Sequence, residues 1–431
     1  MATVTYFSRS DVDPTFSVRN LGIEALLSWE DHSFHIETIS PTSARYSLEN
    51  GFHVKLVGTG FTSAGGQLGG TGTITSLQIL GTDGTTVLRT MSLSLATHVF
   101  NDALSYFTMY QLGEWLLGGN DTLNGSAAAD SITGYGGADR ISGGAGDDYI
   151  EGGAGRDVFN GGAGFDVLSF SLAHDDLNAV RGIVLNAAAG TVTDAYGNAE
   201  TFTGFESFHG TQFGDVMTGS SINEVFVGLG GRDRIDGGGG FDEVQFDFDI
   251  YFGARIEGVT VNLTAGTAID DFGRTDTLIN IEAVRGTDFA DRLTGNAVAN
   301  RLRGEYGNDV LNGRAGNDTL IGGDGRDIFV FNAPLSSTTN VDIIDDFSAA
   351  DDTIWLENAI FTALPTTGAL ASTAFVSNTS GLAADASDRV IYERDTGMLY
   401  YDSNGSAAGG RVAVAHLDAW LNLTAADFTV I

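Results

Sequence analysis

Aspartate recurs every nine residues in three stretches of this chain, in most copies after a glycine-rich turn. Fifteen such units occur, and the best of them read Gly-Gly-x-Gly-x-Asp-x-apolar-x. An aspartate carboxylate and the backbone carbonyls of a glycine turn are hard oxygen ligands, which Ca²⁺ binds in sets of about six to eight. The spacing therefore predicts a series of calcium sites, with the sixth residue of each unit as a ligand.

The predicted metal ligands share the sixth position of their units. They are Asp121, Asp130, Asp139, Asp148, Asp157 and Asp166 in a first run (116–169), Asp215, Asp233 and Asp242 in a second (210–245), and Asp291, Asp309, Asp318 and Asp327 in a third (286–330). Glu224 and Asn300 take this position in the two remaining units. The units GSAAADSIT and GNAVANRLR lack the glycine pair, and Glu224 has a longer side chain, so these three units are alternatively structural coils or caps.

The same unit predicts the elements that position these carboxylates. Glycine adopts positive φ freely and lets the backbone approach an ion closely. The eighth residue is apolar between polar neighbours, as at Ile141 and Phe159, which indicates the inward side chain of a very short strand. A unit this short cannot bury an apolar face alone, so successive units must stack as a solenoid. Two units would then form one coil of a flattened parallel β-roll.

This pattern resembles the calcium-binding nonapeptide of the RTX, or hemolysin-type, family of bacterial proteins exported by type I secretion. The resemblance covers residues 116–431. It implies an all-β fold, a parallel β-roll or β-solenoid, with several Ca²⁺ ions held between consecutive coils along its edges. It also implies pairs of sixth-position residues eighteen apart, such as Asp139 with Asp157. The alternative is a disordered Gly- and Asp-rich linker, but disorder requires no nine-residue phase.

The charge of the chain supports a calcium-dependent fold. The 56 Asp and Glu against 21 Lys and Arg give a net charge of −35. Metal-free protein is expected to repel itself, and a divalent cation is expected to reverse that interaction and couple folding to binding. We expect weak, cooperative binding near the roughly 10⁻⁴ to 10⁻³ M range of extracellular modules. Nucleic acid is excluded as a partner, because phosphate contacts require Lys and Arg.

Targeting features give two opposite indications. The chain has no cysteine, no transmembrane stretch of about 18 apolar residues and no basic, apolar signal peptide at its start, which alone would favour the cytosol. The last residues, Asp427 to Ile431, resemble the uncleaved C-terminal signal that RTX proteins present to the type I secretion apparatus. This resemblance implies a secreted, extracellular protein that folds on calcium outside the cell. The alternative for the last residues is a buried final strand.

Three regions are predicted. Residues 1–115 form a small β-rich module with an Asp83-Gly84 hairpin turn and a helix near 96–117. Residues 116–330 form the roll, whose spacers 170–209 and 246–285 resemble each other at an offset of 76 residues and are expected to continue the solenoid as strands. A duplicated scaffold is favoured over duplicated active sites. Residues 331–431 form a β-rich cap over the last coil and carry the secretion signal.

Catalytic motifs do not emerge from the sequence. The absence of HExxH excludes a serralysin-like zinc protease, and the absence of Gly-x-Ser-x-Gly argues against an RTX lipase. A single lysine, Lys55, argues against the acylated pore-forming toxins. We therefore expect a non-enzymatic surface, matrix or adhesion module, with cell-surface or extracellular polysaccharide as a partner. The alternative is a secreted hydrolase or carbohydrate-active enzyme with its site in the N-terminal module or in a spacer groove.

Overall fold

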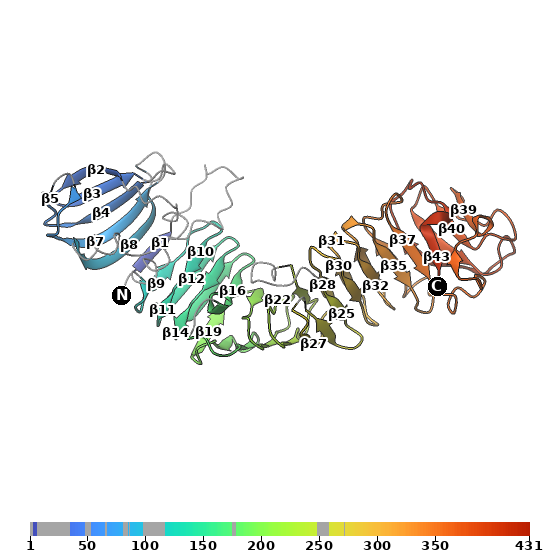
Figure 1. Cartoon of the computed structure of the whole chain (residues 1–431), viewed down its shortest axis with the longest axis horizontal. Helices are drawn as coiled ribbons and strands as arrows, with labels where there is room; N and C mark the ends of the chain where they lie inside the picture. Colours follow the sequence, from blue (N-terminus) through green and yellow to red (C-terminus); the bar gives the residue numbers. More distant parts are fainter. Residues whose placement is uncertain are drawn as a thin grey trace. The chain divides into compact units, whose positions relative to one another are not determined.

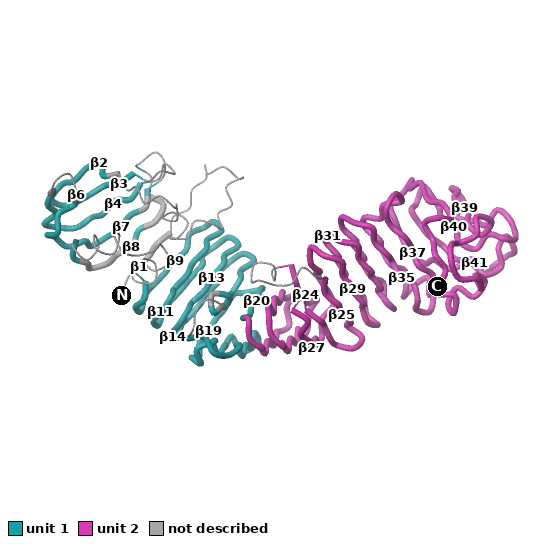
Figure 2. The backbone as a smooth tube through the Cα atoms, in the orientation of Figure 1, with its two compact units in different colours: residues 1–211 teal, residues 212–431 magenta. Residues whose placement is uncertain are grey.

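The chain is a series of short strands that stack in register (Figure 1). The computed structural model describes residues 3–6, 35–47, 53–64, 67–80, 85, 87–97, 117–174, 178–247, 258–270 and 272–431. Two compact units divide the chain, Met1–Thr211 and Gln212–Ile431 (Figure 2). Each unit contains its own stretch of roll.

An antiparallel sheet occupies the N-terminal part of the first unit. Its strands are β2 (His35–Ser40), β3 (Ser43–Ser47), β4 (His53–Thr59), β7 (Thr73–Leu80), β8 (Val87–Ala96) and β1 (Thr3–Tyr6), in that order. A small hairpin, β5 (Ser63–Ala64) and β6 (Gln67–Leu68), lies beside them in sequence. The predicted strands are therefore present. The predicted Asp83-Gly84 turn and nearly all of the predicted helix near 96–117 lie outside the described residues.

The roll of the first unit has two parallel sheets on opposite sides of its coils. One sheet contains β9 (Thr122–Asn124), β12 (Arg140–Ala145), β15 (Val158–Ala163) and β19 (Ala199–Thr203). The other contains β10 (Ser131–Thr133), β13 (Tyr149–Glu151), β16 (Val167–Ser169) and β20 (Ser207–His209). Leu123, Ile141 and Phe159 stand opposite one another, so one coil takes two nonapeptide units. The predicted all-β fold with a parallel roll is confirmed.

Position eight of the unit supplies the core of the roll. Ile132, Ile150 and Leu168 are fully buried, and the residue before each of them is partly exposed. Because strands in a ladder are about 4.8 Å apart, each apolar side chain packs on the one from the coil before. No unit could bury its own apolar residue, and stacking therefore holds the roll together.

The second unit repeats this arrangement over more coils. One side contains β21 (Val216–Thr218), β23 (Arg234–Asp236) and β27 (Thr275–Ile279), and then β25 (Thr260–Asn262), β29 (Arg292–Thr294), β32 (Val310–Asn312), β35 (Ile328–Phe331), β37 (Thr353–Leu356) and β43 (Phe428–Val430). The other side contains β22 (Val225–Val227), β24 (Glu243–Gln245), β28 (Ala283–Arg285), β30 (Arg301–Arg303), β33 (Thr319–Ile321) and β36 (Asp342–Ile344).

Each spacer inserts an antiparallel hairpin and then returns to the roll. In the first unit β17 (Val184–Asn186) pairs with β18 (Thr191–Thr193), which pairs with β19. In the second unit β25 and β26 (Thr267–Ile269) lead in the same way to β27. Strand β19 stacks on β15, and β27 stacks on β23, each as the next coil. The expectation that the spacers continue the solenoid as strands is confirmed.

The C-terminal residues close the second unit. Strands β39 (Phe375–Asn378), β40 (Val390–Glu393), β41 (Met398–Asp402) and β42 (Arg411–His416) extend the sheet beyond β36. Strand β43 lies between β37 and β38 (Gly368–Ala369), and Phe428 is fully buried. In the folded protein the last residues are therefore a buried strand. No helix in the described part of the chain has the length and hydropathy of a membrane span.

Candidate metal centre

The sixth-position side chains line up along the two edges of the roll. All thirteen predicted ligands are buried, and Asp130, the most accessible, is 8 % exposed. Nine of the thirteen side chains accept a hydrogen bond from the backbone N–H of the sixth-position residue one coil earlier. This bond, 2.7 to 2.9 Å long, joins Asp121 to Asp139, Asp130 to Asp148, Asp139 to Asp157, Asp148 to Asp166, Asp215 to Asp233, Glu224 to Asp242, Asp291 to Asp309, Asn300 to Asp318 and Asp309 to Asp327. The structure thus brings together the residues eighteen apart that the resemblance paired.

The second carboxylate oxygen distinguishes one group of turns. In these units, which we call open turns, the Oδ2 atom is buried and has no hydrogen-bond partner. The open turns end in Asp139, Asp148, Asp157, Asp166, Asp242, Asp309, Asp318 and Asp327. A buried acceptor without a donor costs about 1–3 kcal/mol, and more when it is charged. A cation would satisfy these oxygens.

The first glycine of the unit creates the space for this oxygen. A Cβ atom added at Gly143 would lie 2.1 Å from Asp148 Oδ2 and 2.5 Å from the carbonyl oxygen of Gly161 in the next coil. Similar distances hold at Gly304, next to Asp309 and the carbonyl of Gly322. A carboxylate oxygen and a backbone carbonyl therefore face the same small space, and both are ligands that Ca²⁺ prefers. The residues present fit calcium.

Backbone conformation gives the open turns their shape. The second and fourth residues have positive φ, for example +110° at Gly144 and +103° at Gly146. Tyr135, Glu305 and Arg314 take the second position with φ between 67° and 76°, although they carry a side chain. Non-glycine residues rarely adopt this conformation, so the stacked turn imposes it.

A second group, which we call closed turns, satisfies its own side chain. The backbone N–H of the second residue donates to the sixth-position side chain, from Ser126 to Asp130 at 2.6 Å and from Thr287 to Asp291 at 2.7 Å. The same bond binds Glu224 and Asn300. These units lack glycine at position four. The thirteen predicted ligands therefore fall into different environments, and a closed turn has less need of a cation.

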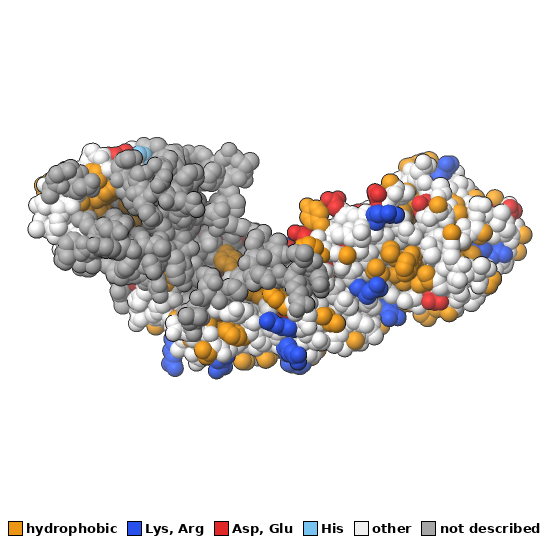
Figure 3. All heavy atoms as spheres, in the orientation of Figure 1, with side chains coloured by type: hydrophobic (Ala, Val, Ile, Leu, Met, Phe, Trp, Pro, Cys, Tyr) orange, Lys and Arg blue, Asp and Glu red, His pale blue; other side chains and the backbone are white. Residues whose placement is uncertain are grey.

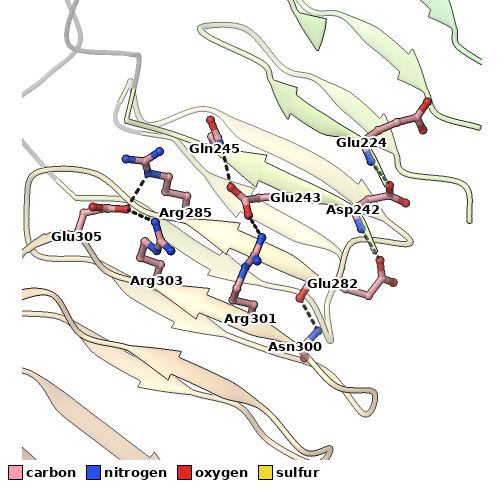
Figure 4. Close-up of polar contacts among 10 residues, drawn as sticks. All are labelled: Glu224, Asp242, Glu243, Gln245, Glu282, Arg285, Asn300, Arg301, Arg303 and Glu305. Carbon is pink, nitrogen blue, oxygen red and sulfur yellow. Dashed lines mark hydrogen bonds and ion pairs between the residues drawn. The ribbon is translucent and has the colours of Figure 1, made fainter. Parts of the chain in front are cut away.

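Several carboxylates that sequence spacing did not identify continue these rows. Asp276, Glu206, Glu282, Asp342 and Asp352 accept the equivalent backbone hydrogen bond from Asp233, Asp166, Asp242, Asp318 and Asp327 at 2.9 to 3.1 Å. Figure 4 shows Glu224, Asp242 and Glu282 in one such row. Their separations from the preceding member are 43, 40, 40, 24 and 25 residues instead of 18. An apolar residue two places later, such as Leu278 after Asp276, is the sequence signal that could have found them.

Some carboxylates outside the rows have cationic partners. Glu305 receives the Arg285 Nε at 2.7 Å and the Arg303 Nη1 at 3.4 Å, and Arg301 binds Glu243 (Figure 4). In the rows, burial has the opposite electrostatic effect. Burial, together with the charges of neighbouring row carboxylates and against an opposing backbone hydrogen bond, raises the pKa of Asp148 to about 7 and that of Asp309 to about 8.

Side chains alone do not complete a metal site. Within the described residues, no group of three or more His, Cys, Asp or Glu side chains could hold a metal ion by itself. Since Ca²⁺ takes about six to eight oxygens, backbone carbonyls of the turns would have to supply most of them. Because backbone carbonyls of the glycine turns are needed as ligands beside the carboxylate, glycine recurs in the unit as regularly as aspartate.

The glycine at position one provides a direct test of this geometry. We expect Gly143→Ala to destabilise the calcium-loaded roll by about 1–3 kcal/mol, because the methyl group would displace Asp148 Oδ2 and the Gly161 carbonyl. Gly239→Ala is the matched control, since a Cβ there meets nothing within 4 Å. Urea denaturation in millimolar calcium measures both variants. Equal stabilities of the two variants would contradict the proposed use of this space.

Comparison with known proteins identifies the repeat. A family model described as RTX calcium-binding nonapeptide repeat (4 copies) matches residues 117–150, 133–168, 209–244, 285–316 and 294–329. No curated protein matches the chain. Among solved structures, the extracellular lipase LipA from Serratia marcescens is similar at 18 % identity and a TM-score of 0.19, over 72 % of this chain and 40 % of the lipase. The chain thus spans less than half of that lipase.

Proposed function

We propose that this chain, which contains RTX calcium-binding nonapeptide repeats, is secreted and that extracellular calcium folds its roll into a non-enzymatic module that binds a surface or matrix. The observation that carries the calcium part is the row of buried Oδ2 atoms without donors, five of which, those of Asp139, Asp148, Asp166, Asp242 and Asp309, face the same small space as a carbonyl of the next coil. Bound Ca²⁺ would supply the positive charge that these carboxylates lack. The open-turn aspartates and Asp233 are the first candidates to hold it, and Asp121, Asp130, Asp215 and Asp291 follow.

Export in an unfolded state is the second part of the proposal. The type I secretion apparatus would have to bind residues 427–431 before they become the buried strand β43. Low calcium inside the cell would leave the rows of carboxylates uncompensated, and the strand would stay accessible. The proposed division of the chain is an N-terminal module (1–115), the roll (116–330) and a C-terminal cap (331–431).

A surface feature of the second unit favours a carbohydrate partner. An open cavity of about 490 Å³ beside the third run is lined by Glu305, Tyr306, Asp324, Asp346 and Asp351. Tyr306 is 55 % exposed and offers an aromatic face, and carboxylates accept hydrogen bonds from sugar hydroxyls. Apolar side chains are also exposed at several places on the face drawn in Figure 3. This cavity is the proposed contact for extracellular polysaccharide.

Binding and turnover can be measured on the same samples. We expect the calcium-loaded chain to sediment with insoluble polysaccharides without releasing reducing ends, and we expect chelator to abolish sedimentation. Tyr306→Ala should weaken binding at least several-fold, whereas Trp420→Ala, which alters an exposed aromatic residue of the C-terminal region, should not. Release of reducing ends would instead support the carbohydrate-active enzyme. Equal binding by both variants would remove the cavity from the proposal.

A further inference from the structure

The first spacer brings a buried glutamate against Asp157, the fifth of the six sixth-position aspartates of the first run. Strand β19 pairs with β15 so that Thr201 stands opposite Val158, and the Thr201 N–H donates to the Asp157 carbonyl at 3.3 Å. This register places Glu200 opposite Asp157, in the slot that a sixth-position residue would occupy one coil later. Glu200 lies outside the residues that the repeat model matches.

Glu200 is buried with no partner at hydrogen-bond geometry, and the nearby Asp157 backbone N–H lowers its pKa only in part against burial. It is 3 % exposed, and neither of its carboxylate oxygens has a hydrogen-bond partner. Asp157, at 1 % exposed, also leaves its Oδ2 without a partner. Two adjacent buried carboxylates with three unsatisfied oxygens are unfavourable unless a proton or a cation lies between them.

A third carboxylate adds to this charge. Asp194, fully buried in the hairpin turn before β19, accepts hydrogen bonds from the backbone N–H groups of Tyr196 and Asn198 and from the Asn198 side chain. Burial, and then the charges of Asp157 and Asp194, raise the pKa of Glu200 far above its ordinary value. No cation is among the groups that shift the pKa of Glu200 or Asp157.

The duplicated spacer buries corresponding carboxylates but places an arginine beside them. Asp233, Asp270 and Asp276 correspond to Asp157, Asp194 and Glu200 at the offset of 76 residues, but Arg274 stands where the first spacer has Asn198. Burial raises the pKa of both Asp270 and Asp276, and the charge of Arg274 opposes this rise; its guanidinium lies 5.1 Å from the centre of the Phe272 ring. Asp276 also gains the Asp233 N–H as a donor at 2.9 Å. The second spacer thus has a cation of its own.

We propose that the first spacer holds an additional divalent cation site, in which Glu200 and Asp157 are the carboxylate ligands and Asp194 is an anionic neighbour, and that Arg274 takes the place of this ion in the second spacer. Calcium is the expected ion, because the donors are all oxygens. The proposal rests on calcium binding by the repeats, as proposed above. The site would fix the first spacer to the last coil of the first run, where the nonapeptide pattern ends.

Two variants of the full chain test this site. Glu200→Gln keeps the shape and removes the charge, and Asn198→Arg introduces the cation found in the second spacer. We expect each variant to bind one calcium ion fewer than the parent in equilibrium dialysis at saturating millimolar calcium. Asp395→Asn makes the same change in charge as Glu200→Gln at an exposed position outside the rows, and it should leave the count unchanged. Circular dichroism in calcium checks that all variants fold.

The possible outcomes distinguish the additional site at Glu200 from calcium binding by the repeats. Unchanged counts in both variants would overturn the additional site while leaving calcium binding by the repeats intact. Loss of an ion in Glu200→Gln but not in Asn198→Arg would overturn the substitution of the ion by arginine. A parent chain that binds no calcium would overturn the proposed function itself, and the present site with it.

Discussion

Removal of calcium at pH 7.5 is expected to abolish most of the far-ultraviolet β signal of this protein, and millimolar calcium is expected to restore it cooperatively. Of its 56 Asp and Glu, 23 are buried in the described part of the chain, where the buried residues include no Lys or Arg. Carboxylates in consecutive coils therefore repel one another inside a poorly solvated edge, and only the folded chain can bind an ion between them. Circular dichroism during a calcium titration measures the transition.

Single aspartates should move the midpoint of this transition. Asp309→Asn preserves the oxygen that accepts the Asp291 N–H but removes the charge, so we expect a calcium midpoint several-fold higher. Asp395→Asn, with the same change in charge at an exposed turn, should leave it unchanged. Part of the signal should survive chelation, because the antiparallel sheet of β2, β3, β4, β7 and β8 contains no row carboxylates. A complete β signal without calcium would contradict metal-coupled folding.

Metal-free protein is expected to be more stable in mild acid than at pH 8, the reverse of the usual behaviour. Burial raises the pKa of Asp139 and Asp309 from 3.8 to about 8 and that of Asp148 to about 7. Between these values and 3.8 the folded chain binds more protons than the unfolded chain, so the free energy of unfolding falls as pH rises. The stabilisation is fully present below about pH 4 and is lost by about pH 8.

Denaturant titrations in calcium-free buffer between pH 5 and 8.5 measure this dependence. Calcium requires deprotonated carboxylates, so the same series in millimolar calcium should keep its stability at pH 8 and the calcium midpoint should fall as pH rises. If the free energy of unfolding in calcium-free buffer stays constant or rises with pH, protonation does not stabilise the row carboxylates in the absence of calcium.

Much of this fold could be predicted from local chemistry. The nine-residue period sets where the chain turns, and the apolar residue at position eight must face inward, as Ile141 and Phe159 do. The coil length, the parallel sheets and the pairing of residues eighteen apart follow from stacking such units. The coil and the strands depend on residues near one another in sequence, so periodicity predicted them, whereas the pairing of residues eighteen apart was implied by the resemblance to the RTX repeat.

The environment of each carboxylate was decided by the tertiary structure. Asp130 and Asp148 occupy the same position in adjacent coils, yet Asp130 receives the Ser126 N–H, whereas Asp148 Oδ2 has no donor. The difference depends on whether the second residue of the turn has positive φ, which stacking imposes on Tyr135 and Arg314 despite their side chains.

Sequence spacing likewise could not predict which carboxylates of the spacers join the rows. Glu200 and Asp276 join the rows because β19 and β27 return to the roll in register after an inserted hairpin, 43 residues after Asp157 and Asp233. The sequence by itself determined the repeating unit, its coil and its calcium chemistry. Only the tertiary structure decided which buried oxygens have a donor and which lack one. The reason is that the donor can be a backbone N–H up to 43 residues away along the chain.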